Sequence, residues 1–295
     1  MEKGLRMTTI TAKVIADTKH KGNRLTTMEL RYPRIILAEL NTHRMFSRNT
    51  SSSRAIPVER LIENVEHDPY IPLSWGQNAR TMWSDGEIDD NMKGLAYKIW
   101  MDTMSNAVEN ARQMADIGIH KQFVNRILEP WSHVSTIVSS TEWDNFFNQR
   151  ISQFAQPEMR LLAEKMKEAI DSSTPREITS TAGDRNYWSP ESWHLPYITK
   201  NEIENVSSLL LFKVSVARCA RVSYKSHVTG KVSTVDEDVE LFNRLFNNGH
   251  WSPFEHIARP SKFDNTNFRG FVQFRKILES QKNGVILGEE YDGIA

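Results

Sequence analysis

The stretch HRMFSRNTSSSR, residues 43–54, is the most distinctive part of this 295-residue chain. Residues 31–54 contain five arginines, one glutamate and no lysine. Planar guanidinium groups suit two-point contacts to phosphate or carboxylate, and the serine, threonine and asparagine side chains add short donors. The pattern therefore predicts either a local anion site or a solvated polar loop, because no glycine-rich phosphate motif accompanies it.

The residues before this stretch predict a hairpin followed by a short helix. Apolar residues alternate in Thr8–Thr18 and again in Leu25–Tyr32, which is typical of strands. Lys21-Gly22-Asn23 supplies the turn between them. Pro33 favours the first turn of a helix that continues to Leu40 and leads into the arginine-rich stretch.

Most of the remaining elements are predicted to be helices. Apolar residues between Asp89 and Ile117 recur at steps of three and four, so a long amphipathic helix is expected whose apolar residues, including Leu95 and Ile99, belong to the core. Capping boxes at Thr199-Lys-Asn-Glu202 and Thr234-Val-Asp-Glu237 mark two later helices, the second ending at Asn247-Asn248-Gly249. Three further helices are predicted over His120–Leu128, Glu142–Arg150 and Pro157–Ile170.

Residues 172–197 follow neither a helical nor a strand period, which predicts a long connection. Its aromatic residues Tyr187, Trp188 and Trp193 are unusual for a flexible linker. We therefore expect the connection to pack down on the protein, with a subunit contact as one option.

Composition excludes several classes of protein. With 39% hydrophobic and 25% charged residues the chain is neither disordered nor collagen-like. Thirty-seven basic and 37 acidic residues cancel, so nucleic acid is an unlikely partner. The single cysteine, Cys219, cannot form an internal disulfide, which favours a cytoplasmic location. No apolar run approaches the roughly 20 residues needed to cross a membrane, so none is expected as a partner.

A second polar stretch is GHWSPFEH, residues 249–256, which holds two histidines and a glutamate. Such a group suits a metal site, an acid–base site or a cofactor cradle. The spacing is not HExxH and no cysteine or further histidine lies nearby, so structural or cofactor-contacting histidines are favoured. A third polar set lies on predicted helices and comprises Asn125, Arg126, Asn145, Arg150, Gln156 and Glu158.

Together these blocks resemble the flavin-dependent thymidylate synthases, whose signature is an Arg-His-Arg triplet followed by a loop with serine and arginine. Here Thr42-His43-Arg44 stands at the triplet, and the loop residues follow at the family's spacing as Ser47, Asn49, Ser52 and Arg54. GHWSPFEH is close to the family's GHxSPxEH, and NRILEP at 125–130 is similar to its ARxxLP. ARCARVSY at 217–224 resembles the segment before GHxSPxEH, and the last helical block is matched by Asn145, Arg150, Ala155, Gln156 and Glu158.

The order of the blocks indicates a circular permutation, because the two blocks that come first in the family come last here. The resemblance implies an α+β fold with a mixed sheet and long packed helices. We expect one catalytic domain over 1–295. Within it, 1–171 carry the His-Arg loop and the nucleotide-binding helices, 172–198 form the connection and 199–295 form the displaced block. Such a rearrangement is tolerated when the old ends can be joined.

The resemblance implies reductive methylation of dUMP to dTMP, with FAD as cofactor and methylenetetrahydrofolate and NADPH as co-substrates. It also implies a homotetramer with active sites between chains. The implied flavin contacts are His43, Arg44, Asn145, His250, Ser252 and Glu255. The implied dUMP contacts are Glu39, Ser52, Arg54, Arg126 and Arg150, and the expected catalytic residues are Arg150, Arg54 and His250. Arg150 beside the pyrimidine would stabilise negative charge as C5 becomes nucleophilic. Neither a metal nor a protein thiol is required, so Cys219 is expected to be an inert thiol at a helix end.

Four positions depart from the family pattern. Thr42 replaces an arginine, Glu39 a glutamine, Thr50 an acidic residue and Ala55 a frequent tyrosine. An anionic acceptor at residue 39 would favour an amino group over a carbonyl. A related C5 hydroxymethylase or methylase acting on dUMP or dCMP is therefore the alternative, and a non-catalytic nucleotide- or RNA-binding relative is a third.

Overall fold

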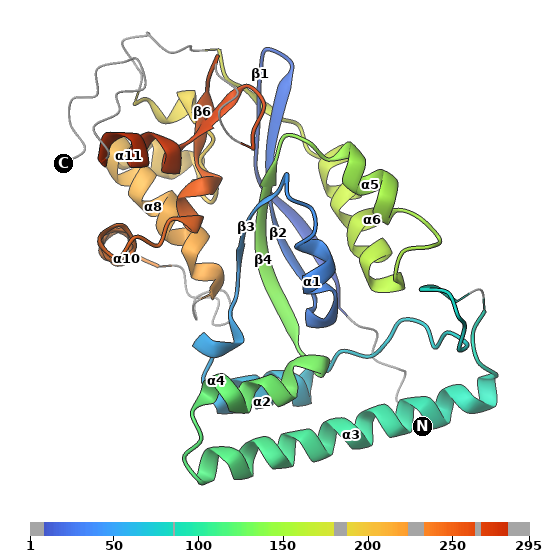
Figure 1. Ribbon diagram of the computed structural model, residues 1–295. Helices are drawn as coiled ribbons and strands as arrows, with labels where there is room; N and C mark the ends of the chain where they lie inside the picture. The colour runs from blue at the N-terminus through green and yellow to red at the C-terminus, as the bar shows by residue number, and fades with distance from the viewer. Residues whose placement is uncertain (1–8, 85, 180–187, 224–232, 263–266, 283–295) are drawn as a thin grey trace.

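A computed structural model of the chain describes residues 9–84, 86–179, 188–223, 233–262 and 267–282 (Figure 1). Thr8, Tyr187 and Tyr224, which the sequence analysis invoked, lie outside the described residues. The strands are β1 (Thr11–His20), β2 (Asn23–Pro33), β3 (Ser47–Thr50), β4 (His133–Ser140), β5 (Arg176–Glu177), β6 (Ala258–Pro260) and β7 (Phe271–Gln273). The α-helices are α1 (Leu37–Leu40), α2 (Val58–His67), α3 (Asp90–Asp116), α4 (Lys121–Val124), α5 (Asp144–Arg150), α6 (Pro157–Asp171), α7 (Lys200–Asn205), α8 (Ser208–Ala220), α10 (Val235–Asn247) and α11 (Phe274–Lys282). The 3₁₀ turns are η1 (Arg34–Ile36), η2 (Ser53–Ala55), η3 (Asn125–Trp131), η4 (Pro190–Ser192), η5 (Arg221–Ser223) and η6 (Ser252–His256).

Five strands form a mixed sheet in the order β3-β4-β2-β1-β5, which confirms the predicted α+β class. Strands β1, β2, β4 and β3 pair antiparallel, and β5 adds to β1 in parallel. The predicted hairpin turns at Lys21 and Gly22, whose φ angles of 46° and 89° are those that a tight hairpin turn requires. Strands β6 and β7 form a separate two-stranded sheet.

Strands β3 and β4 were not predicted. The arginine-rich stretch contains β3, whose backbone pairs with β4 from Ser47 to Thr50. Strand β4 lies inside the sheet, because β2 bonds to one of its edges and β3 to the other. Its sequence HVSTIVSS is rich in β-branched residues, which fit a pleated buried surface.

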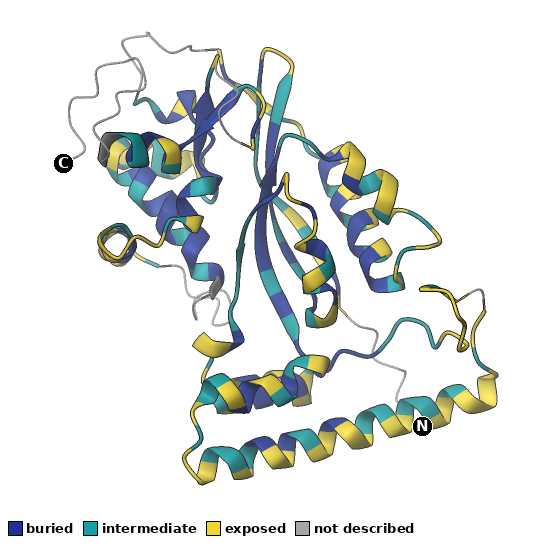
Figure 2. Cartoon of the chain, viewed as in Figure 1, coloured by how far each residue is buried: buried dark blue, intermediate teal, exposed yellow. Residues whose placement is uncertain are grey.

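Helices cover both faces of this sheet (Figure 1). On one face α5 and α6 pack over Met28 and Leu30 of β2. On the other face α8, α10 and α11 pack with Ile137 of β4. Helices α2, α3 and α4 form a third cluster with η3 at one end of the sheet. Strands β2 and β4 between these layers are largely buried (Figure 2).

The long helix α3 is confirmed, but part of its expected core face is wrong. Asp89 caps it by accepting from the backbone N–H of Asn91. Met104 and Val108 are buried against α2 and η3, whereas Leu95 and Ile99 are 52% and 58% exposed. The first half of the helix extends beyond the cluster that covers its second half (Figure 2).

The helix predicted over 120–128 is also wrong in its second part. One α-helical turn, α4, is followed by the 3₁₀ turn η3, which contains Pro130. Proline supplies no N–H for an α-helical bond. Asn125 donates from Nδ2 to the carbonyls of Ser53 and Ile56, so this turn is bonded to the end of the arginine-rich stretch.

The connection packs against its own chain. Trp188 stacks on Trp193 with ring centroids 5.5 Å apart, and Trp193 is fully buried with its edge on Phe212 of α8. Trp193 is therefore buried within one chain by α8 and α11, and a subunit contact made by another part of the connection stays a prediction. Both predicted capping boxes, at Thr199 and Thr234, are present.

Candidate active site

The guanidinium of Arg150, the last residue of α5, is bound by three residues around the end of α1. Its Nε donates to Nε2 of His43 at 2.8 Å, and Nη1 donates to the Glu39 carboxylate. Nη2 lies 3.4 Å from Oγ1 of Thr42, the longest of these contacts. Glu39 and Thr42, two of the positions that depart from the family pattern, thus both contact Arg150. The Nη2 edge of the guanidinium has the weakest contact within the protein.

His43 is neutral in this arrangement. Burial, together with the positive charges of Arg150 and Arg48, lowers the pKa of His43 to about 4. Because Nε2 accepts from Arg150, the proton of the neutral ring belongs to Nδ1. The ring packs edge-on against Phe146 of α5 at 4.8 Å, which fixes its plane. His43 can therefore offer one N–H donor to a bound molecule.

Arg48 was missed as a functional residue, although it lies in the stretch that was singled out. Its Nη1 donates to the backbone carbonyls of His43, Asn41 and Leu40, at 2.8, 3.2 and 3.3 Å. Arg48 thereby closes the turn that carries Thr42, His43 and Arg44. Neighbouring Arg44 projects into solvent and forms no ion pair with the residues that the structure describes.

The displaced block lies directly beside this loop. Ser252 of η6 places its Oγ 3.3 Å from Oδ1 of Asn49 in β3. Gln273 of β7 donates from Nε2 to Oγ of Ser47 at 2.7 Å and to the carbonyl of Glu255 at 3.2 Å. GHWSPFEH and the His-Arg loop, about 200 residues apart in sequence, therefore form one surface.

A second group of polar residues surrounds Glu129 in η3. Its carboxylate accepts from Ser53 Oγ at 2.7 Å, from Arg126 Nη1 at 2.9 Å and from Arg34 Nε at 3.0 Å. Glu129 occupies the leucine position of the family's ARxxLP, and sequence reasoning assigned it no role. Arg54 is exposed nearby in η2 and has no ion pair among the described residues.

The three arginines expected to bind substrate lie in two groups. Arg150 lies at the start of β3, whereas Arg54 and Arg126 lie beyond its end. Four extended residues separate the groups, about 13 Å of strand. One chain therefore presents two polar groups along β3 and does not gather all three arginines at one point.

The remaining expected flavin contacts are placed differently. Asn145 is exposed on α5 and its Oδ1 accepts from Gln149. His250 is exposed just before η6. Glu255 forms an ion pair with Arg275 of α11, so the negative charge of its carboxylate is balanced within the protein. Glu158, a residue of the last helical block to which no flavin contact was assigned, is buried at the start of α6, where it accepts from Tyr70 and Leu73 and has a structural role.

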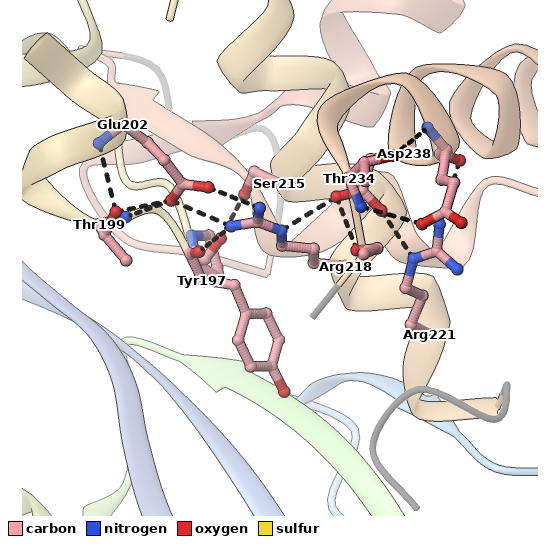
Figure 3. Close-up of polar contacts among 11 residues, drawn as sticks. Tyr197, Thr199, Glu202, Ser215, Arg218, Arg221, Thr234 and Asp238 are labelled. Carbon is pink, nitrogen blue, oxygen red and sulfur yellow. Dashed lines mark hydrogen bonds and ion pairs between the residues drawn. The ribbon is translucent and has the colours of Figure 1, made fainter. Parts of the chain in front are cut away.

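The arginines of ARCARVSY are also structural (Figure 3). Arg218 donates to Glu202 of α7 at 2.6 Å and to Asp238 of α10 at 3.0 Å, and Arg221 donates to Asp238 at 2.7 Å. The backbone carbonyl of Tyr197 also accepts from Arg218. These bonds join α7, α8 and α10 of the displaced block into one unit.

Cys219 is fully buried on α8, and burial raises the pKa of its thiol well above the ordinary value. A buried thiol held in the neutral form is a poor nucleophile. Its backbone carbonyl accepts from Nδ2 of Asn49, so α8 contributes a main-chain contact to the loop.

The described residues contain neither a candidate metal site nor a helix that could span a membrane. No group of three or more histidine, cysteine, aspartate or glutamate side chains there is arranged to hold a metal ion. No helix in the same residues is long and apolar enough to span a membrane.

Comparison with known proteins gives a family match and distant structural likenesses. No curated protein matches the chain. A UMP/dUMP methylase, PolB, from Streptomyces cacaoi bound with 5-Br dUMP is 14% identical, with 55% of this chain and 90% of that chain covered and a TM-score of 0.45. Thymidylate synthase X from Helicobacter pylori with FAD and dUMP is 19% identical, with 50% and 67% covered and a TM-score of 0.34. Both TM-scores lie below 0.5, so the assignment rests on sequence.

The family model described as thymidylate synthase complementing protein, Thy1, matches residues 25–176. That span is more than half of the chain and includes the His-Arg loop, NRILEP and helices α5 and α6. It ends before GHWSPFEH, in keeping with the displaced position of that block. The chain therefore belongs to the Thy1 family, the thymidylate synthase complementing proteins.

Proposed function

We propose that this protein is a flavin-dependent thymidylate synthase that methylates dUMP reductively to dTMP, with FAD as cofactor and methylenetetrahydrofolate and NADPH as co-substrates. The observation that carries this proposal is the arrangement of neutral His43, Arg150 and the adjoining η6 around one loop of a Thy1-family chain. The enzyme works as a homotetramer. The separation of Arg150 from Arg54 and Arg126 along β3 supports an active site completed by a second copy. The single cysteine supports a cytoplasmic location.

The residues present fit a flavin dinucleotide. Arg44 is an exposed cation without an ion pair among the described residues, which suits a diphosphate. His43 offers a neutral Nδ1–H, and the exposed His250 and Ser252 offer further polar groups on the adjoining surface. Asn145 and Glu255 complete the set. When bound, FAD supplies the redox chemistry that turns the folate-derived methylene into a methyl group.

On the nucleotide, Arg54, Arg126 and Ser52 bind the phosphate and sugar, and Arg150 lies against the pyrimidine. Glu129 holds Arg126 in place by an ion pair at 2.9 Å. Arg150 donates toward the ring from its least occupied edge, Nη2, and stabilises negative charge as C5 becomes nucleophilic. No protein nucleophile takes part, because the thiol of Cys219 is buried and protonated.

The Glu39–Arg150 ion pair favours a second candidate function. A carboxylate beside a guanidinium presents an acceptor next to donors, and cytosine presents its amino group next to an acceptor nitrogen. The second candidate is therefore a C5 methylase or hydroxymethylase that acts on dCMP.

Release of tritium from C5-labelled nucleotide tests these functions. With methylenetetrahydrofolate and NADPH, the proposal predicts release from dUMP, with dTMP as product. Release from dCMP alone supports the second candidate and contradicts the first. Binding of nucleotide without release from either, and without flavin, identifies a non-catalytic nucleotide- or RNA-binding relative.

A further inference from the structure

Three neighbouring strands place one hydroxyl each in the same row of the sheet. Ser139 of β4 pairs with Ser47 of β3 on one side and with Thr27 of β2 on the other. All three side chains are buried, with exposed fractions of 1% or less. A row of buried hydroxyls on a sheet is costly unless every member is bonded.

Each hydroxyl is bonded by one residue from the later part of the chain. Gln273 Nε2 lies 2.7 Å from Ser47 Oγ, His256 Nδ1 lies 2.8 Å from Ser139 Oγ, and His194 Nε2 lies 2.7 Å from Thr27 Oγ1. Ser139 and Thr27 are themselves 2.6 Å apart. We call these six residues the polar seam, listed from the sheet as Ser47, Ser139 and Thr27 and from the facing segments as Gln273, His256 and His194.

The hydrogen bonds that run from His256 to Thr18 have one consistent donor-to-acceptor direction. Among the described residues Nε2 of buried His256 has no hydrogen-bond partner. An unpaired buried N–H is rarer than an unpaired acceptor, so the proton lies on Nδ1 and is donated to Ser139. Ser139 then donates to Thr27, Thr27 to Nε2 of His194, and Nδ1 of His194 to Thr18 at 2.9 Å.

Two observations agree with this direction. Burial lowers the pKa of His194 and of His256 to about 3, so both rings are neutral and each has one donor and one acceptor. A bulge between Val14 and Ala16 changes the alternation of β1, which brings Thr18 to the face that His194 covers.

From this network we infer that the polar seam sets the register in which η6 docks on β3, and that His256 and Ser139 are positioning residues for the flavin-contacting loop. Apolar contacts between two layers tolerate sliding, whereas a row of hydroxyls that are each bonded to a facing residue matches its partners in one register only. Ser252 and Glu255, the proposed flavin contacts of η6, lie within four residues of His256. The functional part of this inference rests on the proposed function.

A distance measurement tests the positioning without flavin. Nitroxide labels are attached at Met45→Cys and Asn248→Cys, both exposed, because buried Cys219 does not react. Pulsed electron paramagnetic resonance is recorded on labelled protein diluted with unlabelled protein. We expect one narrow distance in the wild-type background and a distribution at least twice as broad in the Ser139→Ala/His256→Leu variant. An unchanged distribution in that folded variant overturns the inference.

Two matched variants separate positioning from stability. Replacing both partners of a buried bond by apolar groups leaves neither partner of that bond unpaired, so the double variant is expected to unfold cooperatively. Ser139→Thr keeps the hydroxyl and should keep the narrow distance. Ser215→Ala removes another buried hydroxyl bond, to the carbonyl of Pro196, and should lower stability without broadening the distance. Broadening in Ser215→Ala equal to that in the double variant overturns the inference.

Flavin binding supplies the functional arm. The dissociation constant of FAD should rise at least tenfold in Ser139→Ala/His256→Leu and stay within twofold of wild type in Ser139→Thr and Ser215→Ala. Wild-type affinity in the double variant contradicts the positioning role. If wild-type protein binds no FAD but the double variant broadens the distance, the docking role stands and the proposed function fails. Nitrogen-15 spectra of the imidazoles should show the Nδ1–H tautomer for His256 and His194, and Nε2–H at His256 overturns the direction.

Discussion

At the scale of single residues, Arg150 is the group on which the proposed chemistry depends most. Replacing Arg150 by alanine removes donors aimed at developing charge, which typically costs about 10²–10³ in turnover. We expect that loss in tritium release, with a smaller effect on the unfolding temperature, because the Arg150–Glu39 pair remains partly in contact with water. Arg160→Ala on α6, which breaks only an exposed pair with Glu164, is the matched control and should keep full activity. Normal turnover in Arg150→Ala would remove this residue from the mechanism.

Cys219 separates a thiol-independent mechanism from one that needs a cysteine nucleophile. Cys219→Ser should retain wild-type turnover per folded molecule, because the thiol is buried and its pKa is raised. Burying a hydroxyl without a partner should lower the unfolding free energy by about 1–3 kcal/mol, measured by urea titration. Loss of all activity with fold and nucleotide binding intact contradicts the proposed mechanism.

At the scale of elements, Asp238 in α10 holds two arginines of α8 and η5. It is fully buried and accepts from Arg218 and Arg221 (Figure 3). Asp238→Ala leaves two mostly buried guanidinium groups without this partner, which should cost about 3–5 kcal/mol of unfolding free energy. Asp236→Ala, an exposed change in the first turn of the same helix, should cost less than about 1 kcal/mol. An equal loss of unfolding free energy in the two variants would show that the buried ion pairs of Asp238 stabilise the protein no more than an exposed carboxylate does.

The buried histidines make the stability of the sheet–η6 contact depend on pH. The pKa of His194 and of His256 is lowered to about 3, against about 6.5 in an unfolded chain. The unfolded state therefore binds more protons between these values, and stability falls as pH falls from about 6.5, by up to about 1.4 kcal/mol per pH unit for each ring. The midpoint of urea unfolding should decrease from pH 7 to pH 4.5.

Two variants test whether the buried rings cause this dependence of stability on pH. His256→Gln should reduce the slope without abolishing it, because the pKa values of His43, His133 and His194 are lowered as well. Ser215→Ala should shift the midpoint downward at every pH and leave the slope unchanged. A midpoint independent of pH in the wild-type protein would show that neither ring is held neutral.

Elements with local signals were predictable and those fixed by distant partners were not. The hairpin turn, the capping boxes at Thr199 and Thr234 and the long α3 are written in short sequence patterns. Strand β3 is polar and only four residues long, and it is a strand because β4 supplies its partners. Leu95 is exposed because the cluster of α2, α4 and η3 covers only the second half of α3. The periodicity of α3 alone does not specify how far that cluster extends.

The candidate site shows the same division. Motif spacing identified His43, Arg150 and Ser252, and the structure brings His43 to Arg150 and Ser252 to the same loop. Arg48 and Glu129 were missed as functional residues because their importance lies in carbonyls and arginines that they contact after folding. A glutamate within an otherwise family-like NRILEP was the available signal for Glu129.

At the scale of the whole molecule, the proposed permutation predicts that chain order can be restored. A chain in which residues 188–295 precede residues 1–187 has the family's block order and keeps every described contact between η6 and β3 available. It should fold cooperatively with the same circular dichroism spectrum and bind FAD within tenfold of wild type, because packing depends on position in space. A second chain reordered between Ile137 and Val138 cuts β4, an internal strand of the sheet, and should not fold. Aggregation of both chains alike would contradict the permutation.

The central claim, a flavin enzyme acting on a pyrimidine nucleotide, is tested most directly by the absorption spectrum of the purified protein with and without dUMP. The account predicts the visible bands of bound oxidised flavin and a change in those bands when dUMP is added, because the nucleotide and the flavin share one site beside His43 and Arg150. A protein that remains colourless after incubation with FAD, or whose flavin bands do not respond to either dUMP or dCMP, would contradict it.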